Sequence, residues 1–188
     1  QSSELRQYPH KHAGSYSTSI DVQVVGRRVY ISGNPSRFNR LDNLFGYQTI
    51  DQCISVYNDI LSKLSIPPLT VCKFCGLRES IKESGSVSLI PVVSGCHITK
   101  LHITSNVSVG QGMIDTYIKA LSSQPWRNRA GRLHANGKTA DWVSKLGNAR
   151  DIYASVYDKA NEMTLRIIPK IERMFGKDSN EYAYLSNL

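Results

Sequence analysis

Hydrophobic and polar residues alternate along two short segments near the start of the chain. Residues 19–24 and residues 28–32 each place apolar side chains at every second position, with Val25-Gly26-Arg27 between them. Because successive side chains of a strand point to opposite faces, this period predicts two strands joined as a β-hairpin. Gly33-Asn34-Pro35 then ends the second strand, since proline cannot donate a hydrogen bond to a sheet.

A helical period follows at residues 50–64, where apolar side chains recur every three or four positions. Thr49 and Gln52 form a capping-box pattern at its start, and two prolines follow its end. The same period predicts a second helix over residues 113–121, which Pro125 stops.

Strand-like patterns occupy much of the remaining chain. Residues 97–107 are rich in β-branched side chains and predict a central strand. Two short β-like runs lie within residues 69–95, and residues 139–145 form another candidate strand after the Asn136-Gly137 turn signal. With a final helical region, this order predicts an α+β fold, in which an antiparallel β-sheet has helices packed on one face.

Composition narrows the class of protein. The chain has 188 residues, of which 40% are hydrophobic, so it can bury a core as one generous domain or two small ones. No apolar run approaches the roughly 20 residues that span a bilayer, and the first residues lack the pattern of a secretion signal. We therefore expect a soluble globular protein without a membrane partner.

The net charge of +8 predicts a polyanionic partner, because basic side chains that neutralise phosphates release condensed counterions. The charge concentrates between Trp126 and Arg150, which hold six basic residues and one acid, Asp141. His134 and Trp142 also lie in this stretch. Cations beside flat rings can hold phosphates while bases stack, so we expect residues 126–150 to contact nucleic acid.

The cysteines allow a different interpretation. Cys72 and Cys75 form a C-x-x-C pair, and Cys96-His97 follows twenty-one residues later. Three thiolates and an imidazole could form a tetrahedral zinc site, although Cys96-His97 does not repeat the C-x-x-C form. The alternative is that all the cysteines, including Cys53, are reduced and partly buried.

Two further strings carry candidate chemistry. Tyr153 and Tyr157 are four residues apart, so they share a face in either a helix or a strand, whereas Lys159 joins Tyr157 only in an extended segment. Two core tyrosines are the alternative interpretation. In the predicted strand 97–107, Lys100 and His102 face the same way. A histidine in the middle of a strand is more often a hydrogen-bonded core residue than a metal ligand.

Together the strings resemble the replication initiators of filamentous bacteriophages, the gene II type and the related initiator of vibrio filamentous phages. The similarity covers about residues 15–165, and the tyrosine string is its most specific element. The matching pieces are Ser32–Phe38, Asn43–Gly46, Ile98–Thr104, Thr139–Trp142 and Val156–Glu162.

The resemblance implies a rolling-circle nickase of the HUH endonuclease class, in which a tyrosine attacks a DNA phosphate and stays joined to the 5′ phosphate. On this chain Tyr157 matches the nucleophile and Lys159 its charged neighbour, while Tyr153 is a second nucleophile or a helper. The class is named for two histidines that flank one hydrophobic residue, whereas this chain has Lys100-Leu101-His102.

The resemblance also implies a divalent metal. His102 is the expected ligand, with Asp141 and Glu162 as candidates because they lie in matched strings, and His134 as a further possibility. Nitrogen and oxygen ligands of this kind favour Mg²⁺ or Mn²⁺, which would act as a Lewis acid on a phosphate oxygen.

The expected partners are single-stranded or melted origin DNA and the host helicase and polymerase, in the cytoplasm of a bacterial host. The expected DNA-binding residues are Lys100, Arg127, Arg129, Arg132, Lys138 and Arg150. The expected domain organisation is a ragged segment at 1–15, a nicking domain at 16–165, and a helical segment at 166–188 that begins a truncated or absent extension. Two alternatives stay open: a non-catalytic module that binds single-stranded DNA, and a zinc-stabilised DNA-binding regulator.

Overall fold

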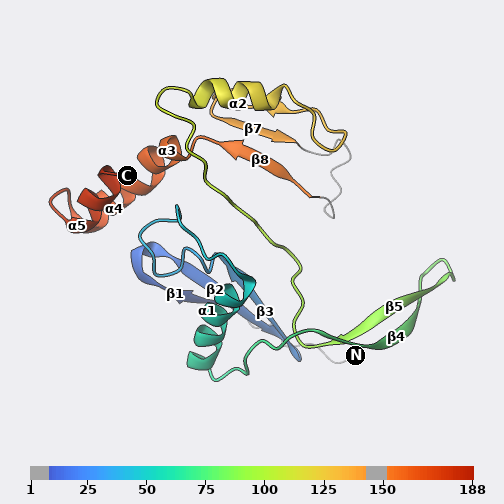
Figure 1. Ribbon diagram of the computed structural model, residues 1–188. Coiled ribbons are helices and arrows are strands. Elements are labelled where there is room, and N and C mark those ends of the chain that lie inside the picture. The colour runs from blue at the N-terminus through green and yellow to red at the C-terminus, as the bar shows by residue number, and fades with distance from the viewer. Residues whose placement is uncertain (1–8, 143–151) are drawn as a thin grey trace. The chain divides into compact units, whose positions relative to one another are not determined.

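The computed structural model describes residues 9–142 and 152–188. It has antiparallel sheets and α-helices, so the predicted α+β class is confirmed (Figure 1). The chain divides into two compact units, the first ending at Ile103 and the second beginning at Thr104.

The first unit contains the predicted hairpin. Strand β1 (His10–Ala13) pairs with β2 (Ser19–Val25), which pairs with β3 (Arg28–Gly33), and all the pairings are antiparallel. A short 3₁₀ turn, η1 (Ser15–Ser17), joins β1 to β2. The β2–β3 register pairs Val25 with Arg28 around a two-residue turn, as the alternating pattern predicted.

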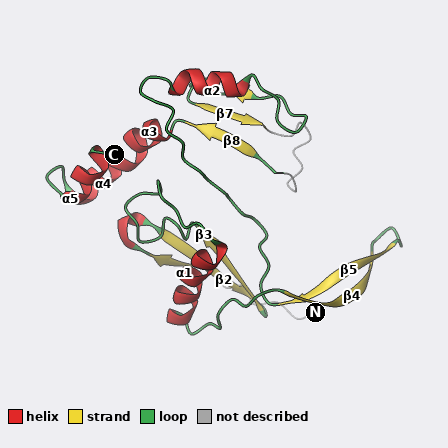
Figure 2. Cartoon of the chain, in the orientation of Figure 1, coloured by secondary structure: helices red, strands yellow, loops and turns green. Residues whose placement is uncertain are grey.

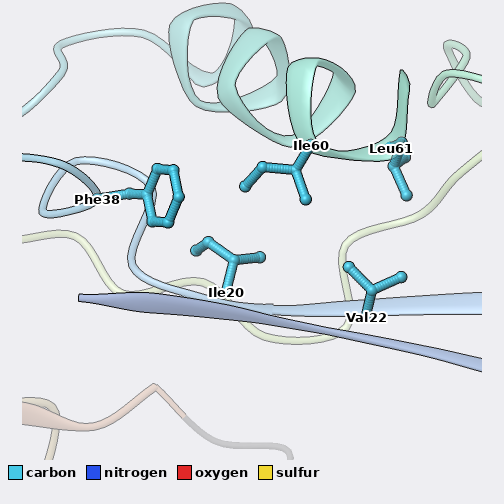
Figure 3. Close-up of a cluster of buried hydrophobic side chains, with 5 residues drawn as sticks. All are labelled: Ile20, Val22, Phe38, Ile60 and Leu61. Atoms are coloured by element: carbon cyan, nitrogen blue, oxygen red, sulfur yellow. The ribbon is translucent and has the colours of Figure 1, made fainter. Parts of the chain in front are cut away.

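Helix α1 (Ile50–Lys63) covers one face of this sheet. The capping box is present, because the Thr49 side chain accepts from the Gln52 backbone N–H and the Gln52 side chain accepts from the Thr49 backbone N–H. Ile60 and Leu61 point from the helix toward the sheet (Figure 3). The buried residues that make up this core are Ile20, Val22, Phe38, Ile60 and Leu61.

Strands β4 (Lys73–Ile81) and β5 (Val87–Ser94) form a separate two-stranded ribbon, which confirms the two β-like runs. The prediction of a strand over residues 97–107 was wrong, because the structure assigns no regular element there and Figure 2 draws the chain between β5 and α2 as loop. A strand needs a partner for its backbone hydrogen bonds, and none of the described strands pairs with this segment.

The second unit has a three-stranded sheet with one helix on it. Helix α2 (Ile114–Ser122) packs against β6 (Arg132–Leu133) and β7 (Thr139–Trp142), and β7 lies between β6 and β8 (Ala154–Tyr157). The predicted second helix and the predicted turn at Asn136-Gly137 are confirmed. Of the predicted strand 139–145, the last three residues lie outside the described part of the chain.

The final helical region is also confirmed. It consists of α3 (Lys159–Glu162), a π-helical turn η2 (Met163–Ile167), α4 (Ile168–Phe175) and α5 (Asn180–Ser186). Its buried side chains include Met163, Ile171 and Leu185. In all, the described strands form three separate antiparallel sheets where we expected one. Among residues 9–142 and 152–188, no helix is long and apolar enough to cross a membrane.

Candidate active site

The sheet of the second unit has one face toward α2 and one polar face. Ala140 and Trp142 are buried, and the Trp142 indole Nε1 donates to the Gln124 carbonyl just beyond α2 at 2.8 Å. Because side chains alternate along a strand, Thr139 and Asp141 occupy the opposite face of β7. The register places Tyr157 directly beside Thr139 on that face.

Asp141 is the centre of the polar face. Its side chain is only 2% exposed, and it accepts hydrogen bonds from Arg132 Nε at 3.1 Å and from the second terminal nitrogen of Arg132 at 2.8 Å. His134 Nε2 lies 2.6 Å from the same carboxylate. The hydrogen bonds from Arg132 lower the pKa of Asp141, although burial acts in the opposite direction. The Asp141 carboxylate therefore stays ionised, and Arg132 holds it in place.

Tyr157 ends β8 and is 38% exposed. Its hydroxyl makes no hydrogen bond within the described residues. Asp158 follows as the N-cap of α3 and accepts from the Asn161 backbone N–H at 2.9 Å, so the strand changes to a helix immediately after the tyrosine. Lys159 then lies with its ammonium 5.9 Å from the centre of the Tyr157 ring. Tyr157 and Lys159 therefore lie close together, as expected.

Tyr153 precedes β8 and is 58% exposed. Strand alternation puts it on the same face as Tyr157, as the spacing of four predicted. The pKa of Arg132 is raised, first by its hydrogen bond to the Asp141 carboxylate, and the Tyr153 phenol contributes in the same direction. Both tyrosines are therefore beside a cation on one polar surface.

Several of the predicted DNA-binding cations already have partners inside the unit. Lys138 Nζ donates to Asp115 at 2.6 Å and lies 3.6 Å from Asp158, and the Asp115 hydrogen bond raises the pKa of Lys138. The Arg129 guanidinium donates to the Ile152 carbonyl and, at 3.5 Å, to the Trp142 carbonyl. These contacts hold the sheet together in addition to any contact with DNA.

Arg127 is arranged differently. Its guanidinium stacks over the Trp126 ring at 5.3 Å, at the tip of a tight turn in which Arg127 and Asn128 both have positive φ. Arg150 lies outside the described residues, and Lys100 lies in the exposed segment that follows β5. All six residues stay predictions as DNA contacts.

The expected metal ligands belong to two different units. His102 is exposed in the first unit, whereas Asp141 and Glu162 belong to the second. Glu162 accepts from Lys159 at 2.6 Å, and Asp141 is held by Arg132 and His134. In the described part of the chain, no three histidine, cysteine or acidic side chains are close enough to share a metal ion. A divalent metal held by these residues stays a prediction.

The same result applies to the zinc interpretation. Cys72 and Cys75 are exposed free thiols, Cys96 is a half-buried free thiol, and they form no metal-binding group within the described residues. The alternative interpretation expected partly buried cysteines, which describes Cys53 and Cys96 but not the exposed Cys72 and Cys75.

Comparison with known proteins adds the evolutionary context. No family model matches the chain, and no solved structure matches it. The replication-associated protein of Escherichia phage If1 is 46% identical to it over 169 residues. The chain is a relative of the filamentous phage replication proteins. The predicted resemblance is therefore confirmed. The alignment covers 90% of this chain and 52% of the phage protein, so the chain spans about half the length of this relative.

The hydrogen bonding of Asp141 is the part of the site that sequence analysis missed. Arg132 and His134 were assigned to DNA and to a metal, not to this carboxylate. A signal for it was present, because Arg132 and His134 alternate on one side of the Asn136-Gly137 turn and Asp141 follows on the other. Pairing the two sides of that turn puts all three side chains on one face.

Proposed function

We propose that the chain is the DNA-nicking part of a phage replication initiator, with Tyr157 as the nucleophile. The observation that carries this proposal is an exposed tyrosine beside Lys159, in a chain 46% identical to a phage replication protein over 90% of its length. Single-stranded or melted origin DNA is the proposed substrate. The host helicase and polymerase are proposed to act on the nicked strand in the bacterial cytoplasm.

In the proposed reaction, the Tyr157 oxygen attacks the scissile phosphorus and forms a P–O bond to the 5′ side of the nick. The bond from phosphorus to the 3′ oxygen breaks, and the proton released by the phenol ends on the 3′ hydroxyl, directly or through water. The number of phosphate ester bonds is unchanged, so a later attack by a 3′ hydroxyl can reseal the strand and free the tyrosine.

The surrounding cations supply the electrostatic part of the proposal. A phenol has an ordinary pKa of about 10, so negative charge on its oxygen needs a cation nearby. Lys159 is only 14% exposed in its side chain and is held by Glu162, so its ammonium keeps a fixed place near the Tyr157 ring. Tyr153 is proposed as a second nucleophile or a helper beside Arg132.

Dependence on Mg²⁺ or Mn²⁺ stays part of the proposal on the strength of the family resemblance. His102 remains the proposed ligand, with Asp141 and Glu162 as candidates. The nicking assay therefore includes Mn²⁺, Mg²⁺ and a chelator as separate arms.

The test is the formation of a covalent adduct. The protein is incubated with single-stranded oligonucleotides that cover the origin of the cognate phage genome, and products are resolved on a denaturing gel. We expect an adduct that Tyr157→Phe abolishes and Tyr117→Phe leaves intact, since Tyr117 is an exposed tyrosine on α2. An adduct that persists in Tyr157→Phe and disappears in Tyr153→Phe would reassign the nucleophile.

A non-catalytic module that binds single-stranded DNA is the second candidate. The cation–ring pair of Arg127 and Trp126 favours it, because such pairs bind strands without chemistry. Oligonucleotide binding without an adduct in any metal arm would favour this function over nicking.

A further inference from the structure

The three-stranded sheet of the first unit has a second face, opposite α1, that the proposed nicking chemistry does not use. Ile20 and Val22 point from β2 toward α1 (Figure 3), so Asp21, Gln23 and Val25 face the other way. The register pairs Gln23 with Tyr30 and Val25 with Arg28 on that second face. None of these residues belongs to the core under α1.

At the turn end of the hairpin this face is hollowed. A depression of about 330 Å³ is lined by Val25, Gly26, Arg27, Arg28 and Tyr30. Tyr30 is 49% exposed, although it lies in the middle of a strand, where aromatic side chains usually pack against neighbours. An exposed ring thus forms one side of a hollow whose rim is basic.

The two arginines of this hollow have no acidic partner among the residues that the structure describes. None of the described residues that line the hollow is acidic. Arg132 and Lys138 in the second unit differ, since both are already paired with aspartates. Within the described residues, no acidic side chain neutralises the positive charge of Arg27 and Arg28.

We propose that the hollow at the β2–β3 turn binds one nucleotide of single-stranded DNA, with a base stacked on Tyr30 and its phosphate held by Arg27 and Arg28. The choice of DNA as ligand rests on the proposed function, whereas the site rests on the hollow, the ring and the two guanidiniums that line it. Guanidiniums bind phosphate oxygens through paired N–H donors, and an aromatic ring accepts the face of any base.

The exposed ring favours a single strand over a duplex. In a duplex the faces of the bases are covered by their neighbours, so Tyr30 could not stack without unstacking them. The size of the hollow also lies at the lower end of the range for sites that hold a small molecule, which suits one nucleotide and not a wide groove.

The first experiment measures binding of the full chain to a fluorescent oligothymidylate, which contains no origin and is not a substrate. For Arg27→Gln with Arg28→Gln we expect affinity to fall about tenfold at low salt. We also expect the slope of log K against log salt to flatten by about 0.7, since one phosphate contact on a single strand contributes about that much. Lys63→Gln with Lys82→Gln removes the same charge from exposed positions away from the hollow, and should change affinity less than twofold.

The ring is tested separately. Tyr30→Thr places a β-branched residue, which also favours strands, at this position and should lower affinity at least about fivefold, because one stacked base is lost. Tyr30→Phe should restore binding, since stacking needs the ring and not the hydroxyl. The proposed site would be overturned if the arginine double variant and the lysine double variant lost equal affinity, or if Tyr30→Thr bound with full affinity.

A second measurement uses the unaltered protein, so it does not depend on the folding of any variant. Oligothymidylate containing 5-iodouracil is crosslinked by light, and the modified residue is found by mass spectrometry. A crosslink at Tyr30 supports the site, whereas crosslinks confined to other aromatic residues refute it. Both measurements are independent of the adduct assay, so a missing adduct with an intact Tyr30 crosslink would count against nicking alone.

Discussion

At the scale of single residues, the second unit depends on a buried charge. A carboxylate that is 2% exposed loses its hydration, and this cost is offset only where other groups supply hydrogen bonds. Arg132 supplies two of them to Asp141, and His134 lies within hydrogen-bonding distance of the same carboxylate. The face that carries Tyr157 is thus held in place by an ion pair instead of by apolar packing.

Replacing this charge should therefore destabilise the unit. We expect Asp141→Asn to lower the free energy of unfolding by about 1–2 kcal/mol, because an amide accepts less well from the guanidinium and places an N–H₂ beside it. The effect stays in this range because the Arg132 side chain is 65% exposed and water solvates it. Urea unfolding measures the loss. Glu172→Gln, which removes a surface pair with Lys177, should cost less than about 0.5 kcal/mol.

The difference in stability between the wild type and Asp141→Asn depends on pH, and the direction of this dependence is defined. The pKa of Asp141 is lowered in the folded chain, so the stability that it contributes is fully present above the ordinary carboxyl value of about 3.9. It is lost as the pH falls through the lowered value, where Asp141 takes up a proton and resembles asparagine. A gap between wild type and Asp141→Asn that widens below pH 4 would contradict the assigned pairing.

At the scale of elements, local signals predicted local structure. The Thr49 and Gln52 capping box and the Val25-Gly26-Arg27 turn were found correctly because each involves residues a few positions apart. Residues 97–107 have an equally strong strand pattern and form no strand. Their pattern does not specify a partner, and pairing is decided by segments distant in sequence. The Asp141 pairings were missed for a different reason, because Arg132 and His134 lie just across the Asn136-Gly137 turn but were assigned to DNA and to a metal.

Close packing between elements gives a second prediction. A Cβ on Gly131, just before β6, would lie 2.1 Å from the Ser122 carbonyl oxygen at the end of α2. Backbone must move to admit it, so Gly131→Ala should destabilise the second unit by about 1–3 kcal/mol in thermal or urea unfolding.

Gly46→Ala is the matched control for this substitution. The nearest atoms to a Cβ there are 3.4 Å away on Ser36, so stability should stay unchanged or rise slightly through the lost freedom of the unfolded chain. Equal stability of the two variants would show that the end of α2 is not packed against Gly131.

At the scale of the whole molecule, the proposed chemistry is divided between units. The two tyrosines, Lys159 and Asp141 belong to the second unit, whereas His102 and the Tyr30 hollow belong to the first. Each unit has its own buried apolar side chains, Ile20 and Leu61 among those of the first and Ile118 and Ala140 among those of the second. Stability and local geometry can therefore be tested in each unit separately.

The connection between the units supplies the last prediction. Lys100 is exposed in a segment without regular structure, and a protease needs an extended, accessible backbone. We expect brief trypsin treatment to release fragments 1–100 and 101–188, identified by mass spectrometry. Lys100→Gln should remove both products, whereas Lys119→Gln on α2 should leave them, since a helical backbone resists cleavage.

The opposite result would have a definite structural meaning. If Lys100 resists trypsin under conditions that cut at Lys82, another exposed lysine of the first unit, residues 97–107 must be protected by backbone pairing. Residues 97–107 would then form a strand that pairs with another strand, and Lys100 and His102 would share one face of it. Cleavage at Lys100 that leaves the near-ultraviolet circular dichroism of the tryptophans unchanged would instead establish that the second unit, which contains Trp126 and Trp142, keeps its packing without the connection.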